Sequence, residues 1–241
     1  IPETELQEAR NLMTEDQYAQ EFECSWTANI SGSIYGKIIQ KMEDDNQISN
    51  FPYDPGCPVD CYFDLGISDK TVILFTQQIG RALIVINCYA DSNKSLDYYA
   101  NFIRKTDYNI RNYVFPHDIE QRELSTGHSR KEYAYSMGMS PIKVCPKLSL
   151  EDGIHAGQIL LAKTYIDRQK CKEFLDAMKW YHRKWIDKSR IFSKPVHDHS
   201  SHYADAWRTC AVAIQELDFN ENKKLNKFAI GTNYNPLGER M

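Results

Sequence analysis

Several features that would define a protein class are absent from this sequence. None of its apolar runs approaches the length of about 18 residues that a membrane-spanning helix requires. Residues 1–10 contain no basic segment and no apolar segment, so no signal peptide is visible, and the missing initiator Met suggests a fragment or a processed chain. There is no short-period repeat and no low-complexity tract. These absences argue against a membrane protein, a secreted precursor and a repeat protein.

The chain also lacks an excess of positive charge and a nucleotide-binding loop. Its formal net charge of −4 gives no overall attraction for nucleic acid and argues against a histone-like binder. An enzyme whose acidic site is neutralised by metal ions, with basic residues on one local face, is still compatible with this charge. Because no G-x-x-x-x-G-K-[ST] motif is present, ATP hydrolysis is not expected of this chain.

The cysteines are seven in number and form no C-x-x-C pair. Cys57 and Cys61 are the only close pair, and a structural zinc site would need two further ligands beside them. The better interpretation is a set of reduced, mostly buried thiols of a cytosolic protein.

What the sequence does contain is enough apolar material for a core. The 241 residues are 42% hydrophobic and 12% aromatic, which predicts one large domain, or one domain with an appended segment. Residues 3–23 are acidic and helix-prone, and Thr14 with Gln17 fits a capping box. The polar stretch 44–58, with its Pro and Gly residues, is a plausible boundary.

After this boundary the pattern becomes strand-like. Residues 59–65, 71–77 and 82–90 are strand candidates, and the last two are nearly continuous apolar runs, as expected of strands covered on both faces. Gly80 suits a hairpin turn between them. Further along the chain we expect a helix over 96–106 capped by Ser95, short strands at 112–115 and 142–145, and helices at 150–165, 171–186 and 201–217. This order predicts an α/β domain with a mixed sheet.

Carboxylates stand at conspicuous positions in this pattern. Asp64 lies near the end of a strand, on the face opposite Phe63. Asp118 follows the strand that ends at Pro116, and the ends of strands in open α/β sheets form ligand crevices. His202 and Asp205 are three residues apart on one face of a predicted helix.

These acids would repel one another if they met, unless a cation neutralised them. Mg²⁺ or Mn²⁺ prefers oxygen ligands, and two such ions can activate water and stabilise the leaving oxygen of a phosphodiester. Taken singly, each residue also has an ordinary explanation. Asp64 could be a turn residue, Asp118 a helix cap, and His202 with Asp205 a solvated pair.

Three segments together resemble a known family. They are "FDLGISDKTVILFTQ" (63–77), "YNIRNYVFPHDI" (108–119) and "HDHSSHYADAWR" (197–208). The chain is similar in these segments to the C-terminal nuclease domain of the large terminase subunit of tailed double-stranded DNA bacteriophages. Residues 17–39 look like the segment that closes the ATPase domain of that family, so the resemblance covers nearly the whole chain.

The resemblance implies a ribonuclease H-like fold, with a mixed central sheet flanked by helices, and a metal-dependent endonuclease that cuts double-stranded DNA with little sequence specificity. It assigns the catalytic and metal-binding acids to Asp64, Asp118 and Asp205, with two Mg²⁺ or Mn²⁺ ions and with His202 as an auxiliary residue. Asp69 is a possible fourth carboxylate. Asp198 is the chief rival for the third position, and Asp205 is preferred because it lies in the Asp-Ala-x-Arg frame of the family.

The resemblance also implies a domain division and partners. Residues 1–50 would be the tail of the ATPase domain, 51–217 the nuclease domain and 218–241 a C-terminal tail. The expected partners are double-stranded DNA, the ATPase domain of the same polypeptide, and the portal protein and small terminase subunit of the full motor. The expected location is the host cytoplasm, at the procapsid portal during packaging.

Two basic regions are candidates for the DNA contact. The segment 122–135 reads as a flexible loop or hairpin close after Asp118, and 170–190 reads as a helix in which basic and aromatic residues alternate. An ordinary amphipathic helix with a solvated basic face would also explain the second region. The predicted DNA-binding residues are Arg122, Arg130, Lys131, Lys179, Arg183 and Lys184.

Two other functions are compatible with the same acids. One is a ribonuclease H-like resolvase or strand-transfer protein, although such proteins have no need of the N-terminal segment "QEFECSW" (20–26). The other is a non-catalytic module that docks on the packaging motor, in which the acids would be relics.

Overall fold

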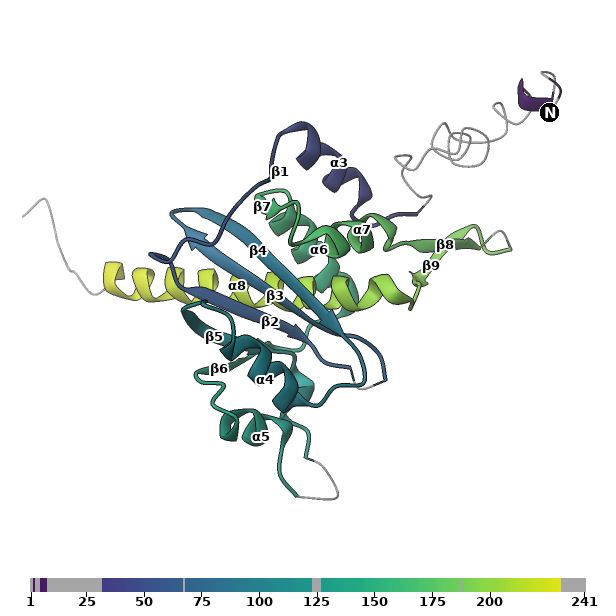
Figure 1. The fold of residues 1–241 in the computed structure, drawn as a ribbon. Helices are drawn as coiled ribbons and strands as arrows, with labels where there is room; N and C mark the ends of the chain where they lie inside the picture. Colours follow the sequence, from purple (N-terminus) through teal and green to yellow (C-terminus); the bar gives the residue numbers. More distant parts are fainter. Residues whose placement is uncertain are drawn as a thin grey trace, which may run out of the picture.

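A mixed β-sheet lies between two layers of helices in this protein, as a computed structural model shows (Figure 1). The structure describes residues 2, 5–7, 32–66, 68–122, 127–186 and 188–230, of which 217–230 are described by their backbone alone. The elements in chain order are α3 (Gly36–Asp44), β1 (Ile48–Ser49), β2 (Val59–Asp64), β3 (Thr71–Ile79), β4 (Ala82–Asp91), α4 (Leu96–Arg104), β5 (Ile110–Phe115), the 3₁₀ helix η1 (His117–Glu120), α5 (Arg130–Ser136), β6 (Ile142–Val144), α6 (Leu150–Leu161), β7 (Thr164–Asp167), α7 (Lys172–Trp180), β8 (Arg183–Ile186), β9 (Ile191–Pro195) and α8 (His199–Ile230).

The main sheet has seven strands in the order β1-β7-β4-β3-β2-β5-β6. Strands β2, β3 and β4 form an antiparallel meander, and the predicted turn at Gly80, with a φ of 60°, joins the last two. β5 pairs in parallel with β2, and β7 in parallel with β4. The predicted α/β class with a mixed sheet is therefore confirmed.

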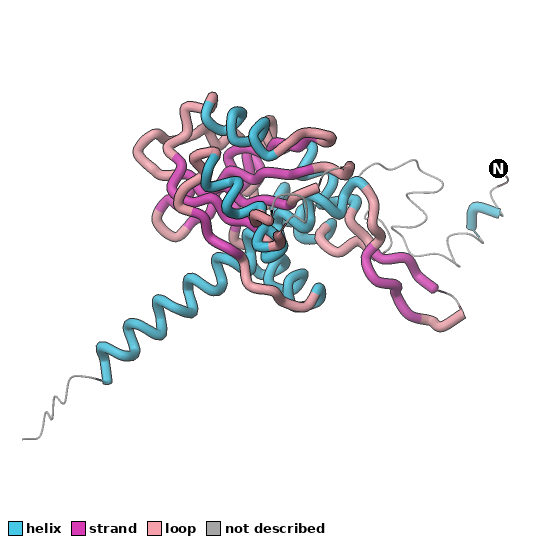
Figure 2. The backbone as a smooth tube through the Cα atoms, turned by 90° about the horizontal axis from the view of Figure 1, so that it is seen from below, coloured by secondary structure: helices cyan, strands magenta, loops and turns pink. Residues whose placement is uncertain are grey.

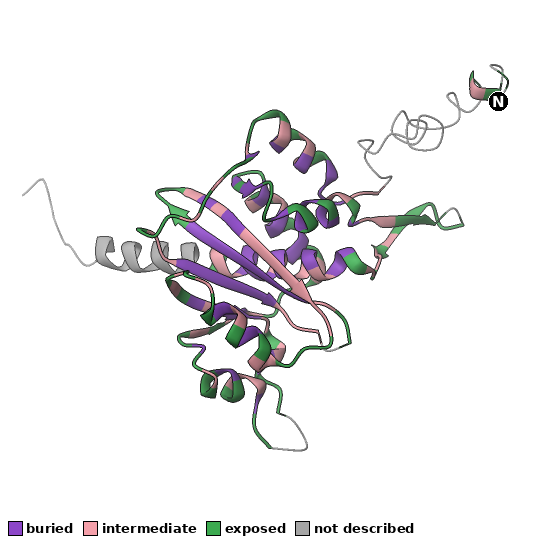
Figure 3. Ribbon diagram, viewed as in Figure 1, coloured by how far each residue is buried: buried purple, intermediate pink, exposed green. Residues whose placement is uncertain are grey.

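Strand β2 and most of β3 are buried on both faces of the sheet (Figure 3), and the side-chain alternation of β2 shows why. Cys61 and Phe63 point into a core that α4 and α5 cover, whereas Tyr62 points into the core beneath α3, α6, α7 and α8. By the same alternation, Asp60 and Asp64 face the α8 side. The strand thus aims its terminal carboxylate at the longest helix of the fold.

Residues before the predicted boundary at 50 take part in this core. Tyr35, Ile39 and Met42 of the α3 region and Ile48 of β1 are buried in the cluster beneath α8. That residues 1–50 derive from a preceding domain stays a prediction, but 34–48 pack against the rest of the fold. The predicted capping box at Thr14 and Gln17 lies outside the described residues.

Two predicted helices are shorter than expected because strands replace their ends. The helix expected over 150–165 ends at Leu161, and β7 begins at Thr164. Ile166 of β7 is fully buried between β1 and β4, so sheet pairing overrides the local helical pattern.

The helix expected over 171–186 is wrong in its second half. It ends at Trp180, after which Tyr181 adopts an extended backbone and stacks on Tyr35 with ring centroids 6.0 Å apart. The chain then forms β8, which pairs with β9 in a hairpin that projects from the body of the molecule (Figure 2). Burial of Tyr181 ends the helix.

The predictions for the cysteines and for the helix that follows Ser95 agree better with the structure. Six cysteines are described and all are free thiols, four of them buried, as expected, while Cys24 lies outside the described residues. Helix α4 begins after Ser95, although the Ser95 side chain makes no capping bond. Within the described residues, no helix is both long and apolar enough to cross a bilayer.

Candidate active site

Asp64 occupies the end of strand β2, where a tight turn follows. Gly66 is required in this turn because a Cβ atom there would lie 2.8 Å from the backbone oxygen of Asp69. The Thr71 hydroxyl closes the turn, donating to the Gly66 carbonyl oxygen at 2.8 Å. The turn therefore brings Asp69 back towards the strand end that carries Asp64.

The Asp64 carboxylate is buried with incomplete compensation. Its side chain is only 19% exposed. Burial raises the pKa of Asp64, the hydrogen bond and charge of His202 and the charge of Arg208 lower it in part, and the nearby charge of Asp118 raises it again. The site is thus short of positive charge.

Helix α8 supplies two residues to this place. His202 and Asp205 lie one helical turn apart, and His202 Nδ1 is 3.4 Å from Asp64 Oδ2. That bond is the main cause of the raised pKa of His202. Burial raises the pKa of Asp205 to about 6, although Arg208, whose Nη1 lies 2.8 Å from Asp205 Oδ1, and His202 pull it down. Residues 64, 202 and 205 therefore lie close together in the structure.

Asp118 approaches from the neighbouring strand. Pro116 ends β5, and Asp118 follows in η1 beside the end of β2, because the two strands run parallel. Phe63 and Phe115 stack with ring centroids 4.2 Å apart and hold the two strand ends together. The Asp118 Oδ1 atom is buried, and no described residue donates a hydrogen bond to it.

Asp198, the rival for the third acid, serves the start of α8. Its Oδ1 accepts hydrogen bonds from the backbone NH of Ser200 at 2.8 Å and from the Ser200 hydroxyl at 2.5 Å. Burial raises the pKa of Asp198, but these bonds outweigh it and the net shift is downward. Asp198 is thus a helix-capping residue with its own donors, and Asp205 is the better candidate.

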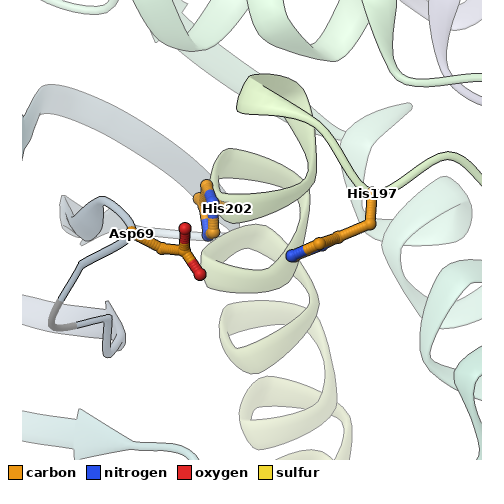
Figure 4. Close-up of side chains that lie close together, drawn as sticks. All are labelled: Asp69, His197 and His202. Atoms are coloured by element: carbon orange, nitrogen blue, oxygen red, sulfur yellow. The ribbon is translucent and has the colours of Figure 1, made fainter.

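A second group of side chains adjoins the acids. Asp69, His197 and His202 each offer a ligand atom, and the three atoms lie within 4.8 Å of one another (Figure 4). The family resemblance gives Asp69 as a possible fourth carboxylate and assigns no role to His197. The segment "HDHSSH" shows the spacing of His197 and His202, but not that they lie near a turn some 130 residues earlier.

The carboxylates fit a divalent cation. Among the described residues, no donor bonds to the buried Oδ1 of Asp118. Asp118 lies near Asp64, which in turn lies near Asp205, and burial raises the pKa of both Asp64 and Asp205. Buried acids of this kind are stable when they are paired with cations, and oxygen ligands suit Mg²⁺ and Mn²⁺. Asp64, Asp118 and Asp205 could hold such ions.

The first set of predicted DNA-binding residues lies around α5. Arg122 is exposed and forms an isolated bridge with Ser129, and the second half of the expected loop is helix α5, which Ser129 and Glu132 cap with a capping box. Arg130 lines a cleft of about 1110 Å³ that Leu65 and Gly66, just after Asp64, also line.

Part of this first set is paired with acids. Lys131 Nζ lies 2.7 Å from Glu120 Oε1, in the helical turn that also carries Asp118. This set is therefore close to Asp118 along the chain.

The second set of predicted DNA-binding residues lies on two different elements of the fold. Lys179 remains on helix α7, where its Nζ lies 3.0 Å from Glu43 Oε1. Arg183 and Lys184 belong to β8 instead of the expected helix, and Arg183 is paired with Glu151 at 2.6 Å. No ion pair of Lys184 is found among the described residues. The single basic helix face predicted from the sequence does not exist.

Solved structures of phage large terminases are similar to this chain. A large terminase from a thermophilic bacteriophage matches with a TM-score of 0.57 and 16% identity, over 89% of this chain and 53% of the terminase chain. The nuclease domain of the P22 large terminase matches with a TM-score of 0.53 and 17% identity, over 70% of this chain and 89% of that domain.

The chain has the fold of a terminase nuclease domain. That fold is ribonuclease H-like, as the resemblance implied, and at these identities the likeness concerns the fold alone. The chain spans about half the length of the large terminase from the thermophilic bacteriophage. No protein-family model and no curated protein matches the sequence.

Proposed function

We propose that this chain is the nuclease domain of a viral DNA-packaging terminase, a metal-dependent endonuclease that cuts double-stranded DNA concatemers with little sequence specificity. The observation that supports it most is the position of Asp64, whose buried carboxylate interacts electrostatically with both Asp118 and Asp205 beside a ribonuclease H-like sheet. The acids come from β2, η1 and α8, and the buried Asp118 oxygen has no donor among the described residues.

Each acid has a role in this proposal. Asp64, which interacts electrostatically with both Asp118 and Asp205, would hold the metal ions together with these two acids. Two Mg²⁺ or Mn²⁺ ions bound there supply an activated water and stabilisation of the departing 3′ oxygen.

The neighbouring side chains orient these ligands. The 3.4 Å contact places Nδ1–H of His202 against Asp64 Oδ2, which fixes the orientation of that carboxylate. Arg208 holds Asp205 Oδ1 at 2.8 Å in the same way. Both residues leave the other carboxylate oxygen of their partner available.

The fold and the local charges support a proposal for the substrate and the partners. Phosphate contacts by Arg122, Arg130 and Lys184, aided by the other predicted basic residues, would hold duplex DNA without reading its bases. In the complete motor, the ATPase domain of the same polypeptide, the portal protein and the small terminase subunit would be partners, in the host cytoplasm.

The direct test is cleavage of linear duplex DNA by the chain in Mn²⁺, in Mg²⁺ and in EDTA. We expect cutting that needs the metal, weakens as salt is raised, and is lost in Asp118→Asn. Asp176→Asn, a change to another acid on α7 with no part in the site, is the matched control and should cut like the wild type. A circular-dichroism melt checks that all three proteins are folded.

Other outcomes would contradict the proposal in distinguishable ways. Cutting in EDTA, or by Asp118→Asn, would reject the metal-dependent mechanism. Cutting of branched junctions but not of linear duplex would favour a resolvase. DNA or portal binding without any metal-dependent cutting would favour a docking module.

A further inference from the structure

The group formed by Asp69, His197 and His202 differs in chemistry from the three carboxylates beside it. It joins the turn after β2 to the start of α8, with one carboxylate and two imidazoles (Figure 4). Asp69 and His197 are exposed, and His202 is 12% exposed, so an ion can enter from solvent. A set of two imidazoles and one carboxylate suits Zn²⁺ or Co²⁺, whereas Mg²⁺ prefers oxygen alone.

The hydrogen bonds around His197 leave a lone pair free for a metal. The Ser201 hydroxyl donates its single proton to the Asp198 carbonyl oxygen at 2.7 Å. Its oxygen must therefore accept from His197 Nδ1, which lies 3.0 Å away, so that Nδ1 carries the ring proton. Nε2 of His197 is then the unprotonated nitrogen, as a metal ligand requires.

His202 has the same arrangement. Its Nδ1 faces Asp64 Oδ2 at 3.4 Å, which leaves Nε2 as the ligand atom. A carboxylate that accepts from the far nitrogen of a metal-bound imidazole is the usual outer support of zinc sites. Both imidazoles are therefore oriented by partners of their own.

Asp69 is held in place but is not neutralised. The tight turn at Gly66 fixes its backbone. The adjacent cation, Lys70, is directed away, to the Tyr203 hydroxyl at 3.1 Å and to Glu173 at 3.7 Å. No described residue donates a hydrogen bond to the Asp69 carboxylate.

We infer that Asp69, His197 and His202 form a binding site for a zinc-class ion, beside the carboxylate site that His202 contacts through Asp64. Zinc ligands at about 2.0 to 2.1 Å from the metal lie roughly 3.3 Å from one another. The present limit of 4.8 Å therefore requires a small inward rotation, which the exposed side chains of Asp69 and His197 can make. The bound ion would tie the turn after Asp64 to the helix that carries Asp205.

Cobalt titration of the intact chain tests this site without measuring cleavage. Excess Mg²⁺ occupies oxygen-only sites, and Co²⁺ is then added while the visible absorption is followed, because four- or five-coordinate Co²⁺ with nitrogen ligands absorbs far more strongly than octahedral Co²⁺ with oxygen ligands. We expect one equivalent to bind with a strong band, to be displaced by Zn²⁺, and to raise the melting temperature.

Single substitutions test which residues bind the cobalt ion. His197→Ala should weaken Co²⁺ binding at least tenfold and abolish the rise in melting temperature, and Asp69→Asn should weaken it similarly. His199→Ala is the matched control, since His199 is also exposed but lies against Trp180 and not in the group. Asp118→Asn should leave the band unchanged, so this site can exist even if the nuclease proposal fails.

Three results would overturn the inference. They are the absence of a strong band, a band that His197→Ala leaves intact, and a band that is lost in Asp118→Asn. The last result would mean that cobalt occupies the carboxylate site.

Discussion

The two ends of strand β2 carry an aspartate on the same face of the sheet, and their surroundings are opposite. Asp60 receives Arg111 Nε at 3.0 Å and Asn112 Nδ2 at 2.7 Å, so both of its oxygens lie near donors of adjacent strand β5. Asp64, four residues further on, has one 3.4 Å contact with His202 and lies near two more acids. The number of nearby hydrogen-bond donors therefore distinguishes Asp60, a structural acid, from Asp64, a candidate metal ligand. Their residue type and their face of the strand are the same.

Replacing each of the two acids by its amide tests the contrast between Asp64 and Asp60 most directly. Asp64→Asn should reduce metal-dependent cutting at least about a hundredfold, because it removes a negative charge that would help to hold the metal ions. The melting temperature should not fall, since burial already disfavours the charged form of Asp64. Cleavage per folded molecule and thermal unfolding are measured on the same preparation.

Asp60→Asn should give the converse result. Loss of the charge that faces Arg111 should reduce the free energy of unfolding by about 1 to 3 kcal/mol, read from urea unfolding. Cutting by the folded fraction should be unchanged. If Asp60→Asn abolished cutting and Asp64→Asn only destabilised the fold, the roles assigned to the two ends of β2 would be reversed.

The pH dependence of the free energy of unfolding tests the surroundings of a third acid, Asp205. Its folded pKa of about 6 is above the value of about 3.9 for an unfolded chain, so the folded state binds the proton more tightly. The stability that this proton contributes is complete below pH 4 and is lost as the pH rises to about 6. Without metal, the loss is at most about 3 kcal/mol.

Asp205→Asn removes that titration. The variant should show a flatter dependence of stability on pH between 4 and 6 and a higher melting temperature than the wild type at pH 7 in EDTA, reduced somewhat because Arg208 loses its partner. Equal pH profiles for the two proteins, measured by thermal unfolding, would contradict the burial of Asp205.

Gly153 tests the support behind Asp205. A Cβ atom at this position in α6 would lie 2.4 Å from Cδ of Arg208, which pairs with Asp205. Helix propensity alone would favour Gly153→Ala by about 1 kcal/mol. We expect instead a loss of about 1 to 2 kcal/mol in urea unfolding, because the clash displaces Arg208. A stabilised variant would show that Arg208 is not confined there.

The smallest expected effect concerns DNA binding. Lys184→Ala should weaken binding of duplex DNA a few-fold and reduce the slope of log affinity against log salt by about 1, because the charge has no ion-pair partner among the described residues. Lys179→Ala should have less effect, since Glu43 already pairs with Lys179 at 3.0 Å. Fluorescence anisotropy at several salt concentrations gives both slopes.

The central strands and the site acids were predictable for different reasons. Alternating and continuous apolar runs, with Gly80 between two of them, predicted β2, β3 and β4 because these signals are local. The meeting of Asp64 with Asp205 is not local, and it was implied only by the family resemblance of three separate segments. The catalytic roles of these residues stay predictions.

The errors arose where tertiary contacts override local preference. Residues 164–167 and 183–186 follow helical stretches without a Gly or Pro between them, yet they form β7 and β8, because β7 fills the gap between β1 and β4 and Tyr181 is buried against Tyr35. The proximity of Asp69 to His197 depends on the turn at Gly66 and on the entry into α8. No short sequence window contains that information.

The most direct test of the central claim is a crystal structure of the chain soaked in Mn²⁺, with anomalous difference density to locate the ions. We predict peaks between the carboxylates of Asp64, Asp118 and Asp205, with Asp118 Oδ1 among the ligands. Absence of any peak there at saturating Mn²⁺, or manganese bound without contact to Asp118, would contradict the account.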